Sequence, residues 1–379
     1  MDEVLRMIEI IEDIRQPWKV KHKLLDIVVI VLFAKLANAD DWEEIEYCAE
    51  YNEDFLKQYI GLENGVPSHD TIERVMGMID PEYMQKIYEK WNELVNSNEG
   101  EKLQKIISID GKTMRGNATA AQKANHIVSA WCDTDGFCLG QEAVKEKSNE
   151  ITAIPKLLDT INVKGCVITI DAMGTQTAIA EKIRAKRADY TLAVKENQRN
   201  LYAEISEYLG NKELLEEIKK SGGYKMTKEK AHSSLEIREY YQCSDIKWMA
   251  EKSRWKGIKS IGMVRKTIKK GDKTTVEQRY YISSLADDID LFARTIREHW
   301  SVEVMHWHLD VTFKEDANTT KDKIAAQNLN IINKWCLSIL KLFEIGKKKM
   351  SLKKKRFCIS LDTSLIQGSS FSKLWLFDF

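Results

Sequence analysis

Two aspartates in the same local context are the first residues in this sequence that could carry chemistry. Asp110 follows the apolar run 106–109, Asp171 follows the run 166–170, and a small residue comes after each aspartate. Runs rich in Ile and Val that stop at a turn predict buried central strands. Acids at the carboxyl ends of neighbouring strands would bring together hard oxygen ligands suited to Mg²⁺. The alternative is that each aspartate caps the helix after its strand.

A third acid is expected downstream, because two aspartates seldom complete a two-metal site. The segment 296–310 predicts a helix on which five polar or aromatic side chains share one face. These are His299, Glu303, His306, Trp307 and Asp310. An acid and two histidines are unusual on a face that packs in a core; the alternative is an amphipathic helix with a hydrated edge. A zinc site of His306 and His308 is less favoured, because residues two apart on a helix point away from each other.

The composition describes a globular protein without a dominant charge. Its 379 residues suit two domains, or one large domain with an insertion. The 58 basic and 58 acidic residues cancel, so nucleic-acid binding would need local patches. Seven scattered cysteines without CxxC spacing argue against a disulfide framework and fit a reducing cytosol. The longest apolar stretch, 27–34, is too short to cross a bilayer, and the N-terminus lacks a signal-peptide pattern. We therefore expect a cytoplasmic protein with no membrane partner.

The order of the expected elements indicates the fold class. A helical pattern covers 24–91, with helix starts expected at Asp40-Asp41 and at Ser68 or Asp70. Five strands and two helices follow: strands 105–110, 126–132, 138–144, 166–171 and 189–195, and helices 150–160 and 175–187. Three strands, then helix, strand, helix and strand is the order of an α/β, ribonuclease H-like core. By analogy with that fold, Asp171 lies beside Asp110.

The segment from about 200 to 275 predicts a charged helix, 201–220, and then a β-rich insertion. Between 247 and 273, ten basic residues stand against two acidic ones, with Trp248 and Trp255 among them. Basic residues with aromatics favour nucleic-acid contact, and a solvated sheet face is about as compatible with the charge alone. A second helical region, 287–345, precedes basic segments that either hold phosphates or form a soluble end.

Several long motifs in one order resemble the H-repeat-associated transposases of bacterial insertion sequences, the ISAs-type DDE transposases. From residue 109 onward the motifs are 109–116, 147–155, 169–176, 280–285, 299–303 and 306–316. The segments 40–46 and 67–71 resemble the N-terminal domain associated with that family. The resemblance covers about 10–358, and residues 363–379 depart from the usual end of the family.

The resemblance implies three domains and a catalytic triad of acids. The domains would be a helical transposase-associated module (1–98), a ribonuclease H-like catalytic domain (99–346) with its β-rich insertion, and a basic C-terminal tail (347–379). Asp110, Asp171 and Glu303 would be the catalytic acids and the ligands of Mg²⁺, for which Mn²⁺ can substitute. The carboxyl groups of the two aspartates should then approach within roughly 4–6 Å.

The wider superfamily often carries Tyr-x2-Arg-x3-Glu-x6-Lys around its glutamate, and this chain keeps only the glutamate. The corresponding positions are Ile296, His299, Glu303 and Asp310. His299 would replace the arginine as a phosphate contact, while His306 and Asp310 would support the metal ligands. The other expected DNA contacts are Lys112, Arg115, Lys195, Lys266, Lys269 and Lys270. For Lys112, Arg115 and Lys195 an ordinary surface role is favoured over a catalytic one. Asn197 and Gln198 are expected to line the cleft.

The resulting hypothesis is a transposase that binds insertion-sequence ends and catalyses metal-dependent strand cleavage and strand transfer. Its partners would be the terminal inverted repeats and target DNA, bound by a homodimer in the DNA complex at the bacterial nucleoid. Two alternatives remain: a ribonuclease H-like nuclease without strand transfer, and a catalytically silent DNA-binding regulator derived from a transposase. The presence of all three acids argues against the regulator.

Overall fold

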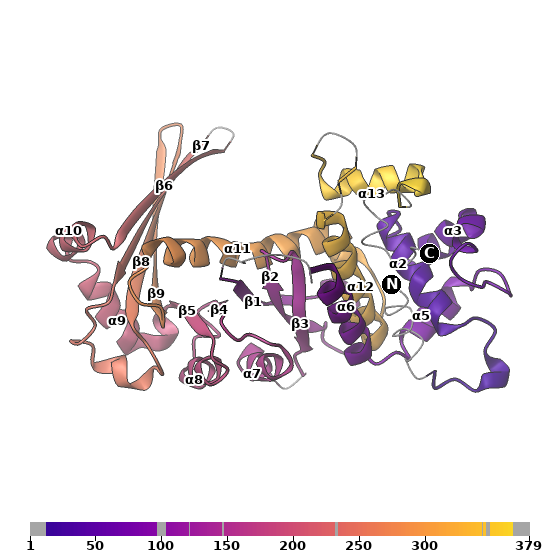
Figure 1. Cartoon of the computed structure of the whole chain (residues 1–379), viewed down its shortest axis with the longest axis horizontal. Helices are drawn as coiled ribbons and strands as arrows, with labels where there is room; N and C mark the ends of the chain where they lie inside the picture. Colours follow the sequence, from indigo (N-terminus) through magenta and orange to yellow (C-terminus); the bar gives the residue numbers. More distant parts are fainter. Residues whose placement is uncertain are drawn as a thin grey trace.

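A long mixed sheet runs through the centre of the computed structural model, which describes residues 13–96, 104–120, 122–145, 148–231, 234–342, 344–345 and 349–366. Within these residues the sheet has nine strands in the order β3-β2-β1-β4-β5-β9-β8-β7-β6 (Figure 1). The strands are β1 (Ile106–Thr113), β2 (His126–Cys132), β3 (Phe137–Ala143), β4 (Val167–Ile170), β5 (Asp189–Val194), β6 (Tyr224–Ala231), β7 (Ser234–Cys243), β8 (Ser260–Lys270) and β9 (Lys273–Ser283). β1, β4 and β5 are mutually parallel, and the other neighbours pair antiparallel.

The first five strands and two crossover helices follow the order predicted from the sequence. α7 (Glu150–Thr160) joins β3 to β4, and α8 (Thr177–Ala185) joins β4 to β5. Both helices pack on one face of the sheet, in a core that includes Ile109 of β1 and Ile170 of β4. Parallel strands covered on both faces read as continuous Ile and Val runs, which is why the sequence pattern located them.

The opposite face of these strands is covered by α11 (Ile289–Val311), the long helix that crosses the molecule in Figure 1. Side chains alternate along a strand, so the residues of β1 between its core isoleucines point toward α11. Ser108 accordingly donates a hydrogen bond to the carbonyl of Glu298 at 3.2 Å. Asp288 caps the helix by accepting from the amide of Leu291 at 2.9 Å. The third candidate acid, Glu303, is therefore carried across the strands that hold the two aspartates.

The β-rich insertion is present, and it continues the central sheet. β9 pairs with β5 in the register Thr191↔Ser283 to Val194↔Tyr280, and β8, β7 and β6 follow outward. The single helix expected over 201–220 is wrong. Two helices form instead, α9 (Arg199–Tyr208) and α10 (Lys212–Lys220), because Asn211 accepts from the amide of Glu213 at 2.8 Å and starts a new helix.

The N-terminal helices share one hydrophobic core with helices from the other end of the chain. They are α2 (Leu24–Leu36), α3 (Trp42–Tyr51), α4 (Glu53–Leu56), α5 (His69–Met76) and α6 (Pro81–Asn96), and they pack with α12 (Lys323–Leu342) and α13 (Leu352–Leu361). The cap predicted at Asp41 is confirmed, because its carboxylate accepts from the amide of Glu44 at 2.8 Å. Ser68 occupies the cap position of α5, and its hydroxyl contacts the Thr71 hydroxyl at 3.1 Å.

Part of the basic segment near the C-terminus is buried, while Lys353 and Lys354 are exposed. Lys355 and Arg356 lie on α13 and are buried. Lys355 donates to the carbonyl of Leu340 at 2.8 Å, and Arg356 donates to the carbonyl of Lys35 at 2.9 Å. These two cations fix α13 to the N-terminal helices and are unavailable to phosphates. No helix in the described ranges is long and apolar enough to cross a membrane.

Candidate active site

The parallel pairing of β1 with β4 places Asp110 and Asp171 side by side. Ile109 is in register with Ile170, so the two aspartates that follow occupy equivalent positions. Equivalent positions on neighbouring strands, which lie about 4.8 Å apart, point their side chains to the same face. Both aspartates line one cleft of about 920 Å³. The separation between the two carboxyl groups themselves stays a prediction.

The same cleft is bounded by β4, β5, β9 and α11. The same cleft that Asp110 and Asp171 line is also lined by Lys195, Arg279, His299 and Glu303. The three acids thus line the same cleft as three other predicted cleft or contact residues, Lys195, Asn197 and His299. Gln198 lies just outside the lining and donates to the carbonyl of Thr175 at 2.9 Å.

Asp171 organises a turn instead of capping a helix. One carboxylate oxygen accepts from the amides of Met173 at 3.0 Å and Gly174 at 3.2 Å. The N-cap of the next helix is Gln176, so the capping alternative is wrong for this aspartate. Asn197 holds the same turn from β5's side by donating to the carbonyl of Ala172 at 2.7 Å. The turn fixes the direction of the Asp171 side chain.

Asp110 lies among several negative charges. Burial is the largest cause that raises its pKa, and the neighbouring carboxylates of Glu150, Asp171 and Glu303 raise it further, to about 7. Repulsion of this kind signals carboxylates gathered without enough positive charge. In the part of the chain that the structure describes, no three His, Cys, Asp or Glu side chains are close enough together to hold a metal ion as they stand.

Glu303 faces the cleft from α11 beside two cations. Burial raises the pKa of Glu303, while Arg279 and Lys266 lower it. Arg279 and Lys266 lie over the ring of Trp300, at 5.8 and 5.1 Å from its centroid. Arg279 had no role in the sequence analysis, although it directly precedes the motif 280–285. Only the pairing of β9 with β5 brings it to the cleft.

Two histidines of α11, His299 and His306, have lowered pKa values and are neutral at pH 7. Burial lowers the pKa of His299 to about 4, and its Nδ1 shares a hydrogen bond with the hydroxyl of Thr169. Burial likewise lowers the pKa of His306 to about 3, and its Nδ1 lies 3.5 Å from a carboxylate oxygen of Asp110. Without a phosphate beside it, His299 therefore presents an uncharged ring to the cleft.

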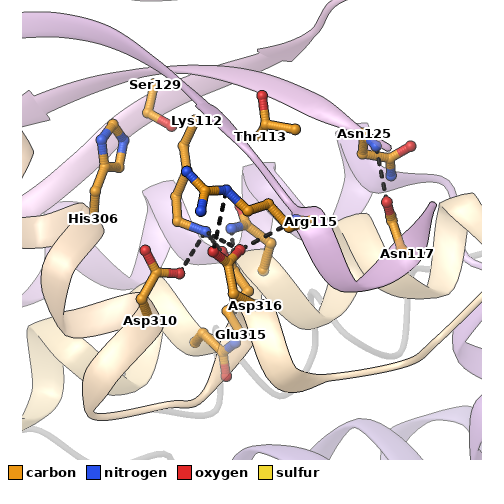
Figure 2. Close-up of polar contacts among 12 residues, drawn as sticks. Lys112, Thr113, Arg115, Asn117, Asn125, Ser129, His306, Asp310, Glu315 and Asp316 are labelled. Carbon is orange, nitrogen blue, oxygen red and sulfur yellow. Dashed lines mark hydrogen bonds and ion pairs between the residues drawn. The ribbon is translucent and has the colours of Figure 1, made fainter. Parts of the chain in front are cut away.

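Lys112 lies outside the cleft, in a cluster of acids at the far end of α11 (Figure 2). Its ammonium contacts Asp310 at 2.7 Å, Glu315 at 2.9 Å and Asp316 at 3.3 Å. Only 10% of the Lys112 side chain is exposed, so this cation serves as an internal tie between β1 and the end of α11. Arg115 is 83% exposed and lies 3.8 Å from Asp316.

The basic insertion presents fewer nucleic-acid features than its sequence predicts. Trp255 is buried in the core below the sheet, so it cannot stack on a base. Trp248 stacks on Tyr208 with ring centroids 4.3 Å apart. Lys266 lies 3.5 Å from Glu236, whereas Lys269 and Lys270 are exposed at the end of β8.

Comparison with known proteins identifies the class. Residues 101–339 match the family described as "Transposase DDE domain", and residues 5–92 match the family described as "DDE_Tnp_1-associated". The first match covers more than half of the chain, which therefore belongs to the DDE transposase family, a family of DNA-cleaving enzymes that use divalent metal ions.

Three relatives from Escherichia coli are similar over almost the whole chain. A protein of strain O157:H7 named "Putative transposase YncI" is 39% identical, over 97% of this chain and 94% of its own length. "Putative protein YbfL" of strain K12 is 38% identical, over 98% of this chain and all of its own length. "H repeat-associated putative transposase YhhI", also of K12, is 37% identical with the same coverage. The resemblance to H-repeat-associated transposases is thereby confirmed.

Proposed function

We propose that this protein is an insertion-sequence transposase that cleaves DNA at the ends of its element and joins the freed 3′ ends to target DNA. One observation carries the proposal: Asp110 and Asp171 are equivalent positions of neighbouring parallel strands, and Glu303 lines the same cleft from α11. The substrates would be the terminal inverted repeats and the target. Because two ends must be joined together, we propose that a homodimer acts on them.

The catalytic core is proposed to be ribonuclease H-like. The strand order β3-β2-β1-β4-β5 with α7 and α8 as crossovers supports this assignment, and so does α11 on the opposite face. The proposed domains are the helical transposase-associated module (1–98), the catalytic domain (99–346) and the C-terminal segment (347–379). The core shared by the N-terminal helices, α12 and α13 indicates that these units fold against one another.

The acids of the cleft fit a divalent cation. Oxygen donors from Asp110, Asp171 and Glu303 are the type that Mg²⁺ and Mn²⁺ prefer, and all three acids line the same cleft. Among the described residues, no three possible ligands are already close enough together to hold a metal ion. The three side chains would therefore move closer together when the cation binds. Bound Mg²⁺ or Mn²⁺ would activate the attacking oxygen and stabilise the departing one.

The chain's own residues would hold and orient the DNA. Lys195 and Arg279 line the cleft and can neutralise a phosphate beside the acids. Lys269, Lys270 and Arg115 are exposed and suit contacts farther along the duplex. Lys112 is omitted from this set because its charge is already matched inside the protein.

Replacement of Glu303 tests the proposal. The wild-type chain should nick and join a supercoiled plasmid carrying the inverted repeats that flank its gene, in Mg²⁺ but not in chelator. Glu303→Gln should lower both rates about 100-fold or more, with thermal midpoint and DNA affinity retained, because it removes one ligand charge without changing the side chain's shape. Asp310→Asn is the matched control on the same helix and should stay active.

Other results of this nicking and joining assay would point to a different acid or a different activity. An active Glu303→Gln with an inactive Asp310→Asn would make Asp310 the third acid. Nicking without joining by the wild type would indicate a nuclease. No metal-dependent nicking at all would contradict the proposed function.

A further inference from the structure

We propose that Glu150 is a fourth carboxylate of the active site, directed toward the divalent metal by His126; the inference rests on the proposed function. Glu150 is the first residue of α7, which runs back along the sheet from the carboxyl end of β1. Its neighbour Ile151 lines the cleft together with Asp110 and Asp171. Glu150 itself lies next to these lining residues, beside Gly111 and on the opposite side of β1 from α11.

His126 holds the Glu150 carboxylate in one orientation. The carboxylate oxygen Oε1 lies 2.7 Å from Nε2 of His126, and Nδ1 of the same ring lies 2.8 Å from the hydroxyl of Thr113. The hydroxyl can donate to Nδ1, which leaves Nε2 as the donor to Glu150. Thr113 and His126 are directly paired across β1 and β2, so the sheet itself fixes this relay.

Gly111 brings the carboxylate against the backbone of the residue after Asp110. A Cβ built on Gly111 would collide with Oε1 of Glu150 and with Nε2 of His126. Glycine at this position therefore provides the space that the His126–Glu150 pair fills.

If the His126–Glu150 hydrogen bond only attached α7 to β2, it would look the same in the structure. A measurement of metal binding is therefore needed to distinguish a structural role from a role in the metal site. The measurement is Mn²⁺ titration of the full-length, DNA-free chain by calorimetry, with the Mn²⁺-induced rise in thermal midpoint as a second readout. Glu150→Gln keeps the shape and can still accept from His126. The matched control is Glu142→Gln, a half-buried acid of β3 that lies 3.9 Å from Lys156.

We expect Glu150→Gln to bind Mn²⁺ about tenfold more weakly than the wild type, while Glu142→Gln binds normally. His126→Ala should weaken binding as well, and His126→Gln, which restores a donor at the ε position, should recover most of it. This rescue would distinguish a positioning role from a loss of folding.

Asp171→Asn separates this inference from the proposed function. If Asp171→Asn loses Mn²⁺ affinity while Glu150→Gln binds like the wild type, the fourth-carboxylate assignment is overturned and the proposed function stands. If Mn²⁺ binds the wild type and both variants equally, the metal site assigned to this cleft is wrong, and both proposals fail together.

Discussion

At the scale of single residues, Lys112 shows how a buried charge is matched inside this protein. Its ammonium contacts three carboxylates, and one of these, Glu315, is only 2% exposed. Glu315 also accepts from the side-chain amide of Asn330 at 2.7 Å. Buried ions are tolerated when they are paired and hydrogen-bonded. Removing one partner leaves the other as an unpaired buried charge, which destabilises the fold.

Lys112→Met should therefore destabilise the fold by about 3 kcal/mol, because it leaves Glu315 buried without its ion partner. Arg115→Met, three residues along and largely exposed, should change stability by less than about 0.5 kcal/mol. Urea unfolding of both variants measures the difference. Equal midpoints for the two variants would show that the Lys112 cluster contributes nothing to stability.

The residues that could be predicted are those whose local context is distinctive. Asp110 and Asp171 follow two Ile-rich runs. Glu303 is spaced from two histidines so that all three side chains lie on one face of a helix. Arg279 and Glu150 gain their significance only from partners far away in sequence, as does the tie from Lys112 to Glu315. No local pattern in a single sequence encodes such pairings, so these residues were missed or misassigned.

At the scale of elements, helix and strand patterns were sufficient for the core. α7 occupies the predicted residues 150–160, and the chain between the predicted strands 126–132 and 138–144 turns at Gly136, whose φ of +71° suits glycine. The predicted helix over 296–310 forms as part of α11, and two residues of its polar face reach β1. His306 approaches Asp110, and Asp310 reaches Lys112.

The insertion shows where element patterns stop being informative. Alternating residues predicted β structure there, but they could not show that β9 would pair with β5 and extend the central sheet. Strand pairing depends on backbone hydrogen bonds between distant segments, which side-chain patterns do not specify. The burial of Trp255 follows from the same packing, and it removes one of the two aromatic residues on which the DNA-binding prediction depends.

At the scale of the whole molecule, buried cations join the two ends of the chain. Lys35 of α2 and Arg356 of α13 both lie in the shared core near Asp40, and Arg356 donates to its carboxylate at 3.1 Å. The Asp40 carboxylate also forms an ion pair at 2.7 Å with Lys314, which lies just beyond the C-terminal end of α11. This network links the N-terminal helices, α13 and the helix that carries Glu303.

Lys35 should make stability depend on pH in the alkaline range. Burial, and then the nearby Arg356, lower its pKa from 10.5 to about 8. Between these values the unfolded chain binds a proton that the native chain lacks, so the contribution of Lys35 to the free energy of unfolding rises with pH, by about 3 kcal/mol in total. Urea unfolding from pH 7 to 10 should show this rise in the wild type relative to Lys35→Met. Parallel curves would refute it.

The central claim is that Asp110, Asp171 and Glu303 together hold a divalent metal, and anomalous diffraction from crystals grown with Mn²⁺ tests it most directly. We predict an anomalous peak in contact with the carboxylates of both aspartates, which should then lie within roughly 4–6 Å of each other. Glu303 should turn toward the same peak from α11. Crystals that show Mn²⁺ elsewhere and none between Asp110 and Asp171 would contradict the account.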